Sequence, residues 1–271
     1  MPFRALYWLS DGLAFLLYRI IGYRKQVILD NLKRAFPEKN NFELERIVKG
    51  VYTNLADVTL ETLKSFTTPI SEIQRRCVIV NPELVADFLQ SGRSVILAGS
   101  HVNNWEYAAL SMPLNFQQPM FGVYKPLSNK VIEAYMTEKR GRGGIAPIPM
   151  DVVLGVLKKQ QKTVASYMLI ADQSPSSRKR AHWVNFFNRE TASLPGTDVL
   201  ARTFDYPVIG YRIRRVKRGF YEVEFFHLCD DPAATAESEI TERYYRQLEK
   251  EIRDTPGNWL WSHKRWKMER G

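Results

Sequence analysis

The feature that most constrains the fold is a short apolar run that leads into a histidine. Residues 95–98 (Val-Ile-Leu-Ala) are all apolar, which is typical of a strand buried on both faces of a sheet. A Gly-Ser pair ends the run, and His101 follows it directly. Asn103 or Asn104 can then cap a helix that begins near Trp105. We therefore expect a histidine at the point where a buried strand passes into a helix.

A carboxylate, Glu106, follows His101 by five residues. Five residues along one helix turn about 500°, so the two side chains could not meet if both lay on the same helix. A strand-to-helix turn between them would allow the contact. A carboxylate bonded to one ring nitrogen fixes the histidine tautomer and favours the imidazolium, as general-base catalysis requires. His101 as a base oriented by Glu106 is therefore the strongest chemical candidate, although a histidine followed by a glutamate is also common by chance. Ser100, the rival nucleophile, lacks a G-x-S-x-G frame.

The rest of the chain alternates helices and strands, which favours an α/β fold. Further strands are expected near residues 78–80, 119–124, 145–150, 163–171, 207–212 and 221–226. Helices are expected at residues 27–36, after Asn40 or Asn41, and at residues 82–90, 129–139, 151–157, 196–204 and 237–253. No repeat or low-complexity linker divides residues 1–271, so we predict a single domain with a mixed, largely parallel sheet flanked by helices.

Three polar residues interrupt the apolar stripe of the helix expected after Asn40. They are Asn54, Asp57 and Glu61. On an amphipathic helix such positions usually face solvent or cap a turn. We expect the same here.

The charge balance predicts an anionic partner. The chain has 39 Lys and Arg against 29 Asp and Glu, a net charge of +10. Nucleic acid, an anionic membrane surface, a phosphorylated substrate or an acidic protein would each suit this excess. The two cysteines, Cys77 and Cys229, are isolated, as is usual in a reducing compartment. No metal site is expected, because the other histidines, His182, His227 and His263, show no paired ligand spacing.

The first 23 residues suggest contact with a membrane. Residues 3–23 are mostly apolar, but charged residues interrupt them, and the longest uncharged run, residues 12–18, is too short to span a bilayer. Aromatic residues such as Trp8 suit the membrane interface. We predict that residues 1–23 form a membrane-associated helix, lying on the surface or following a spanning helix. A core helix at one end of the domain is the alternative.

Polar residues also follow other expected strands. Lys125 follows residues 119–124, and Asp172 and Gln173 follow residues 163–171. Functional sites gather at the carboxyl ends of strands in α/β sheets, although a polar strand end has the same pattern. Residues 140–144 form a basic, glycine-rich turn, and residues 259–267 alternate aromatic and cationic side chains. The tail pattern fits interfacial anchoring, core packing or nucleic-acid stacking.

These motifs together resemble a known family. Residues 100–106 (Ser-His-Val-Asn-Asn-Trp-Glu) match the H-x4-D/E motif of the lysophospholipid acyltransferase superfamily. The later motifs follow in the order and rough spacing of one branch, the late acyltransferases of lipid A biosynthesis. They are Tyr-Lys-Pro at 124–126, Arg-Gly-Arg at 140–142, Ala-Asp-Gln at 171–173, Phe-Phe at 186–187 and Pro-Gly-Asn-Trp-Leu-Trp-Ser-His-Lys-Arg-Trp at 256–266. The resemblance covers nearly the whole chain. Members usually start with a membrane-spanning helix, so we expect either a truncated start or a member that binds the membrane peripherally.

The resemblance implies a glycerolipid acyltransferase-like fold and a reaction. A fatty acyl chain would pass from the thioester of acyl carrier protein, which is acidic, to a hydroxyl of a lipid A precursor at the cytoplasmic face of the inner membrane. No cofactor beyond this donor is implied. His101, oriented by Glu106, would be the general base. Backbone N–H groups after Asn103, or the guanidinium of Arg140 or Arg142, would stabilise the oxyanion or bind phosphate.

The remaining expected substrate contacts are Asn104, Lys125, Asp172, Gln173 and Arg265, the last toward a lipid phosphate. The basic residues 178–180 and 212–218 would dock the carrier protein, although charged runs are by default solvated. Phe186 and Phe187 fit either an acyl pocket or plain core. The alternatives are acylation of another lipid, such as a glycerophospholipid or a mannosylated phosphoinositide, and a non-catalytic basic membrane-binding protein. Nucleic-acid binding is disfavoured because no recognised motif accompanies the charge.

Overall fold

A seven-stranded sheet forms the centre of the protein, whose computed structural model describes residues 1–270 except for the side chain of Arg180. The strand order is β1-β9-β8-β2-β5-β3-β4, and every neighbouring pair is parallel except the β8–β9 hairpin. The predicted α/β class and mixed, largely parallel sheet are therefore confirmed. The strands are β1 (Cys77–Ile79), β2 (Val95–Gly99), β3 (Met120–Tyr124), β4 (Ile145–Pro149), β5 (Ser166–Ile170), β8 (Val208–Lys217) and β9 (Phe220–Cys229). A separate hairpin pairs β6 (His182–Phe186) with β7 (Arg189–Ser193).

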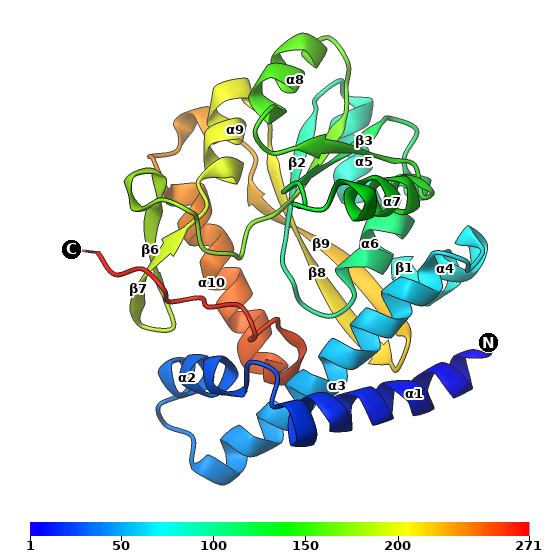
Figure 1. Ribbon diagram of the computed structural model, residues 1–271. Helices are drawn as coiled ribbons and strands as arrows, with labels where there is room; N and C mark the ends of the chain where they lie inside the picture. The colour runs from blue at the N-terminus through cyan, green and yellow to red at the C-terminus, as the bar shows by residue number, and fades with distance from the viewer. Residues whose placement is uncertain (271) are drawn as a thin grey trace.

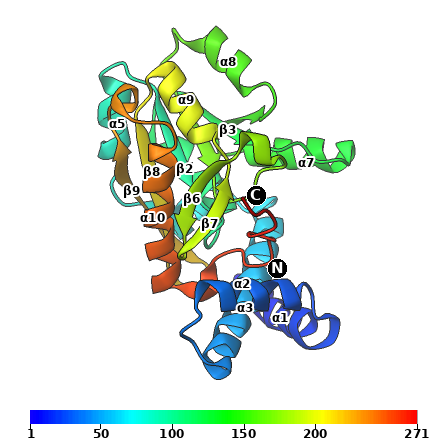
Figure 2. The same cartoon turned by 90° about the vertical axis from the view of Figure 1, so that its left-hand side faces the viewer.

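Helices cover both faces of this sheet (Figures 1 and 2). They are α1 (Phe3–Phe15), the π-helical η1 (Leu16–Ile21), α2 (Lys25–Ala35), α3 (Asn41–Ser65), α4 (Ile70–Arg76), α5 (Glu83–Gln90), α6 (Trp105–Ser111), α7 (Lys130–Gly141), α8 (Val153–Gln160), α9 (Gly196–Phe204) and α10 (Glu239–Asp254). Short 3-10 turns are η2 (Met112–Asn115), η3 (Arg178–Arg180), η4 (Pro232–Ala234) and η5 (Pro256–Asn258).

Strand β2 is buried on both faces, as its sequence predicted. Ile96 and Ala98 point into one hydrophobic cluster, and Val95 and Leu97 point into the other. Successive strand residues face opposite sides of a sheet, so a continuously apolar strand can serve two cores at once. The strand therefore fixes the position of His101 between the two packed layers.

Helix α3 begins at the predicted cap. The Glu43 N–H donates to Asn40 Oδ1 over 3.0 Å, and the Asn40 N–H donates to Glu43 Oε2 over 2.9 Å, which is a capping box. The prediction for the polar residues of this helix was wrong. Asp57 and Glu61 are both 0% exposed, and Asn54 is buried as well. The reason is that α1 lies along α3 (Figure 1) and the β8–β9 hairpin closes over the same side.

The N-terminal helical segment, α1 with η1, places a polar contact toward the protein and apolar side chains toward the outside. Its inward face includes Ser10, which donates to Asp57 Oδ1 over 2.5 Å. Its outward face is apolar, with Trp8 77% exposed and Ile20 67% exposed. Within residues 1–270, no helix has both the length and the hydropathy needed to cross a membrane.

The β8–β9 hairpin is longer than predicted, with ten residues in each strand. Charged residues obscured its alternating pattern in the sequence. They pair across the strands instead, Arg212 with Glu224 and Arg214 with Glu222, both at 2.8 Å. Such cross-strand pairs stabilise a sheet although each residue alone disfavours a strand.

Candidate active site

The site is built at the carboxyl ends of two adjacent parallel strands. His101 follows β2, and Asp172 follows β5, the hydrogen-bonded neighbour of β2. The His101 Nδ1 atom lies 2.6 Å from Asp172 Oδ1, and the His101 backbone N–H donates to Asp172 Oδ2 over 2.8 Å. Two bonds from one residue to both carboxylate oxygens fix the relative position of the ring and the acid.

Asp172 is held as an anion. Its side chain is 2% exposed, and Trp259 Nε1 donates to Oδ2 over 2.7 Å. Burial opposes ionisation, but the positive potential of His101 and the hydrogen bonds from His101 and Trp259 outweigh it and lower the pKa of Asp172 from 3.8 to about 2. The ionised carboxylate therefore stabilises the fold above pH 3.8, and this stabilisation is lost as the pH falls to about 2.

The anionic partner decides which ring nitrogen of His101 could accept a proton. An ionised carboxylate accepts only, so Nδ1 must donate to it and the lone pair must lie on Nε2. Gln173 Nε2 lies 3.4 Å from this atom. The Trp105 ring meets the edge of the imidazole, with the ring centroids 4.9 Å apart and the planes at 76°. The ring is thus held on three sides, with Nε2 available to take a proton.

The structure corrects the predicted partner of His101. The carboxylate bonded to the ring is Asp172, whereas Glu106 binds Arg140, with Nε to Oε2 at 3.0 Å and Nη2 to Oε1 at 2.5 Å. The physical reason is the turn between strand and helix. Asn103 adopts a left-handed conformation with φ of 54°, and the chain then places Trp105 against the imidazole.

The two arginines of the expected basic turn have different positions. Arg140, at the end of α7, binds Glu106 of α6 through Nε and Nη2, so its Nη1 hydrogens are not needed for that pair. Arg142 donates to three backbone carbonyls at the C-terminal end of α3, at 2.7 to 3.0 Å from Ser65, Phe66 and Thr68. It caps that helix, whose last carbonyls lack partners within the helix. The expected oxyanion or phosphate contact of Arg142 is therefore replaced by a structural one.

Two other expected substrate contacts are used inside the protein. Asn104 is buried: its Oδ1 accepts the Tyr107 N–H at the start of α6, and its Nδ2 donates to Glu61 over 2.7 Å. Arg265 is 1% exposed, so it cannot reach a lipid phosphate. Its guanidinium donates to the oxygens of Ala192, Ser174 and Tyr245. Neither side chain has a free polar atom at the surface for substrate.

The aromatic tail belongs to the core. Trp259 and Trp261 pack edge to face at 4.7 Å between ring centroids, and Phe186 packs on Trp259 at 5.9 Å. All three are buried, together with Phe187. Of the interpretations left open for the tail and for the Phe pair, core packing is therefore the correct one.

The basic residues expected to dock a carrier protein are partly neutralised. Across residues 212–218, every arginine pairs with a carboxylate, and Arg215 and Arg218 both reach Asp57 at 2.7 Å. Arg178 and Lys179 are exposed, and the side chain of Arg180 lies outside the described part. Lys125 is exposed after β3, at the same edge of the sheet as His101. Within residues 1–270, no three His, Cys, Asp or Glu side chains gather to hold a metal ion.

Comparison with known proteins agrees with the resemblance inferred from the motifs. The family model for the bacterial lipid A biosynthesis acyltransferase matches residues 1–268. A lipid A biosynthesis lauroyltransferase of Escherichia coli (strain K12) is 26% identical over 270 residues, which cover 98% of this chain and 87% of that protein. A lipid A biosynthesis palmitoleoyltransferase of the same organism is 24% identical over 277 residues, with 98% and 86% coverage. A lipid A biosynthesis acyltransferase of Haemophilus influenzae is also 24% identical, over 274 residues.

Proposed function

The chain belongs to the bacterial lipid A biosynthesis acyltransferase family, and from that premise we propose that it transfers a fatty acyl chain from acyl carrier protein to a hydroxyl of a lipid A precursor. The observation that carries this proposal is the pair of His101 and the ionised Asp172, which leaves Nε2 as a base. An alcohol attacks a thioester at a useful rate only if its proton is removed as the bond forms. A single oriented imidazole can do this without a protein nucleophile.

The proposed steps need only the side chains at this edge of the sheet. His101 Nε2 takes the proton of the substrate hydroxyl, whose oxygen forms a C–O bond to the thioester carbonyl carbon. The tetrahedral intermediate then collapses, the C–S bond breaks, and the imidazolium returns the proton to the departing thiolate sulfur. Asp172 stabilises the imidazolium between these two transfers.

Arg140 is the proposed partner for developing or fixed negative charge. Glu106 holds its guanidinium through two bonds, which leaves the Nη1 hydrogens to meet an oxyanion or a substrate phosphate. Burial opposes the charge of Arg140, but the pairing with Glu106 raises its pKa above the usual value. Lys125 and Gln173 are the further proposed substrate contacts. Glu106 acts through Arg140 in this proposal.

A lipid acceptor requires contact with a membrane, and α1 offers a surface for it. The outward face of α1 and η1 includes Trp8, Phe15 and Ile20, each at least 60% exposed. Arg4 and Arg19 lie in the same segment, where they could meet anionic headgroups. We place the protein at the cytoplasmic face of the inner membrane, with α1 lying in the interface.

Replacing Trp8 and Phe15 together by glutamine should weaken binding to anionic vesicles by roughly thirtyfold, if each buried ring contributes even about 1 kcal/mol. The measurement is flotation with vesicles that contain phosphatidylglycerol. Val199→Gln is the matched control, because Val199 is also an exposed apolar residue on a helix, α9, at the other end of the molecule from α1 (Figure 1). Equal flotation of all three proteins would contradict the proposed orientation.

The reaction itself is tested with the purified full chain, acyl carrier protein loaded with acyl chains of several lengths, and a lipid A precursor. We expect mass spectrometry of the lipid to show the gain of one acyl group, dependent on the loaded carrier protein. The same acyl chain on coenzyme A tests the need for the carrier. Acylation of a glycerophospholipid in place of the precursor would favour the other lipid substrate, and no product with any lipid would favour a non-catalytic membrane-binding protein.

A further inference from the structure

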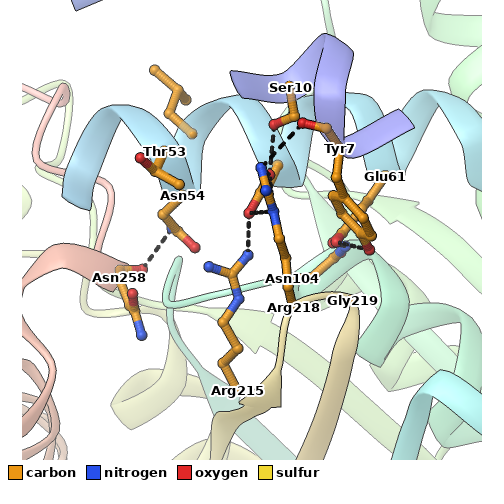
Figure 3. A network of polar contacts seen from close by, with 12 residues as sticks. Tyr7, Ser10, Thr53, Asn54, Glu61, Asn104, Arg215, Arg218, Gly219 and Asn258 are labelled. Carbon is orange, nitrogen blue, oxygen red and sulfur yellow. Dashed lines mark hydrogen bonds and ion pairs between the residues drawn. The ribbon is translucent and has the colours of Figure 1, made fainter. Parts of the chain in front are cut away.

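A buried carboxylate joins the N-terminal helix to the loop that contains His101. Glu61, on α3, is 0% exposed and accepts three hydrogen bonds from three separate elements. Tyr7 of α1 donates to Oε1 over 2.8 Å, while Asn104 and Tyr221 each donate to Oε2 over 2.7 Å. Figure 3 shows the side chains of Tyr7 and Asn104 converging on Glu61. No member of this cluster has a role in the transfer steps described above.

The Asn104 side chain transmits this arrangement to the site. Its Nδ2 is held by Glu61, and its Oδ1 accepts the Tyr107 N–H over 2.9 Å, which caps α6. The next residue is Trp105, whose ring meets the imidazole of His101. Glu106, which holds Arg140, follows directly. A rotation of the Asn104 side chain would therefore release the helix start that positions both sides of the candidate site.

The hydrogen bond from Tyr7 to Glu61 depends on how closely α1 packs against the β8–β9 hairpin. A Cβ atom at Gly219, in the turn of the β8–β9 hairpin, would lie 1.8 Å from the Tyr7 hydroxyl, so only glycine leaves room for it. Ser10, one turn further along α1, anchors the same helix through Asp57. Asp57 also binds Arg215 and Arg218, both at 2.7 Å, and through them the hairpin. Asp11 of α1 also pairs with Arg218 at 2.6 Å. Of these polar contacts of α1, the Tyr7 hydroxyl is the one that donates to Glu61.

We propose that Glu61 is a positioning residue through which the seating of α1 controls the loop that contains His101. When α1 is seated, Tyr7 and Glu61 hold Asn104 in its capping orientation, and Trp105 stays against the imidazole. When α1 moves away, the Glu61 oxygen that faces Tyr7 is left buried without its donor, and the cap is no longer fixed. Leaving a buried acceptor without its donor raises the free energy of that state. The fixed and the released orientations of Asn104 are therefore coupled to the position of α1.

The test compares two deletions of one hydroxyl from α1, Tyr7→Phe and Ser10→Ala. Both remove a donor to a buried carboxylate, but Asp57 keeps its two arginines in Ser10→Ala, whereas Glu61 loses the hydrogen bond that joins it to α1 in Tyr7→Phe. The first readout is the indole NMR signal of Trp105 in protein labelled on its six tryptophans, assigned with Trp105→Phe. The second is the split between kcat and KM for acyl transfer.

We expect Tyr7→Phe to shift the Trp105 signal and to lower kcat by about threefold to thirtyfold, the range usual for coupling between distant sites, with little change in KM. Ser10→Ala should leave the signal in place. Glu61→Gln should retain most of kcat, because its oxygen can accept from Asn104 and Tyr221 while its amide donates to the Tyr7 hydroxyl. An unmoved signal in Tyr7→Phe, or an equal shift in Ser10→Ala, would overturn the proposal.

The rate measurement rests on the proposed function, but the indole signal does not. Wild-type protein without transferase activity would refute acyl transfer and leave the structural coupling to be decided by NMR alone. Active wild-type protein with an unmoved Trp105 signal in Tyr7→Phe would refute the coupling and leave the proposed function intact.

Discussion

Replacing Asp172 with asparagine should lower the rate of acyl transfer by about two to four orders of magnitude, the range that an oriented general base contributes. The overall size and packing of the side chain are unchanged, so the fold should persist. The loss arises from the position of one proton. In the wild-type protein, Asp172 holds that proton on Nδ1 of His101 and leaves the lone pair on Nε2.

An amide at this position reverses the arrangement. Two donors, the His101 backbone N–H and Trp259 Nε1, point at Asp172 Oδ2, so the amide oxygen must take that place. The amide nitrogen then faces Nδ1 and donates to it. Nδ1 becomes the acceptor, the ring proton moves to Nε2, and the base is lost.

Glu106→Gln is the matched control for Asp172→Asn, because it makes the same chemical change five residues after His101. We expect a smaller loss, mainly in KM, since one bond between Glu106 and Arg140 survives in weakened form. The measurement is kcat and KM for both variants, with melting temperatures to show that each is folded. A large loss of kcat in Glu106→Gln with a nearly normal Asp172→Asn would restore Glu106 as the partner of His101.

The second large effect is expected from His101→Ala, which removes the base itself. The rate should again fall by about two to four orders of magnitude. Adding Asp172→Asn to His101→Ala should cause almost no further loss, because the carboxylate acts only through the imidazole. The double variant thus tests whether the two residues work as a unit, and single-turnover kinetics separate the chemical step from product release.

His263 provides the control for this prediction, since it is a second histidine near the site. The backbone N–H of Ser174 donates to its Nε2 over 3.1 Å, a shorter contact than the 3.4 Å between Gln173 Nε2 and His101 Nε2, and one that a side-chain rotation cannot release. Burial, followed by the positive charge of Arg265, lowers the pKa of His263 to about 4, which makes it a poor base at neutral pH. His263→Ala should retain most of the activity. Loss in His263→Ala with normal activity in His101→Ala would overturn the assignment of the base.

The elements of the site were predictable from sequence wherever a local signal determines them. The apolar residues 95–98 identified a strand buried on both faces, and the Asn residues at 40 and 104 marked two helix starts. His101 was placed correctly at the end of a strand for the same reason. These features depend on contacts within a few residues, which a sequence pattern records directly.

The partner of His101 was not predictable in this way. Asp172 lies 71 residues further along the chain and reaches the imidazole only because β5 pairs with β2. Strand order in a sheet depends on the packing of every connecting helix, and no local pattern states it. Glu106 was favoured because it was near in sequence. The left-handed residue Asn103, which turns the chain, has no distinctive neighbours that would reveal its conformation.

The burial of polar residues was missed for a related reason. Asp57 and Glu61 interrupt an apolar stripe on α3, and such positions are usually solvated. Their burial depends on α1, whose Tyr7 and Ser10 face inward as donors. A match between donors on one helix and acceptors on another is visible only once both are placed in space.

The orientation of α1 has a consequence for how this protein can be prepared. An apolar N-terminal segment is often trimmed to make a protein more soluble. Here, removal of residues 1–23 would also take away one hydroxyl donor from each of Asp57 and Glu61, namely Ser10 and Tyr7, and would uncover the side of both carboxylates that α1 now covers. The shortened chain would be more soluble, but the polar layer beneath the candidate site would be disturbed. A mild detergent that shields Trp8 and its neighbours on the intact chain is therefore the better choice.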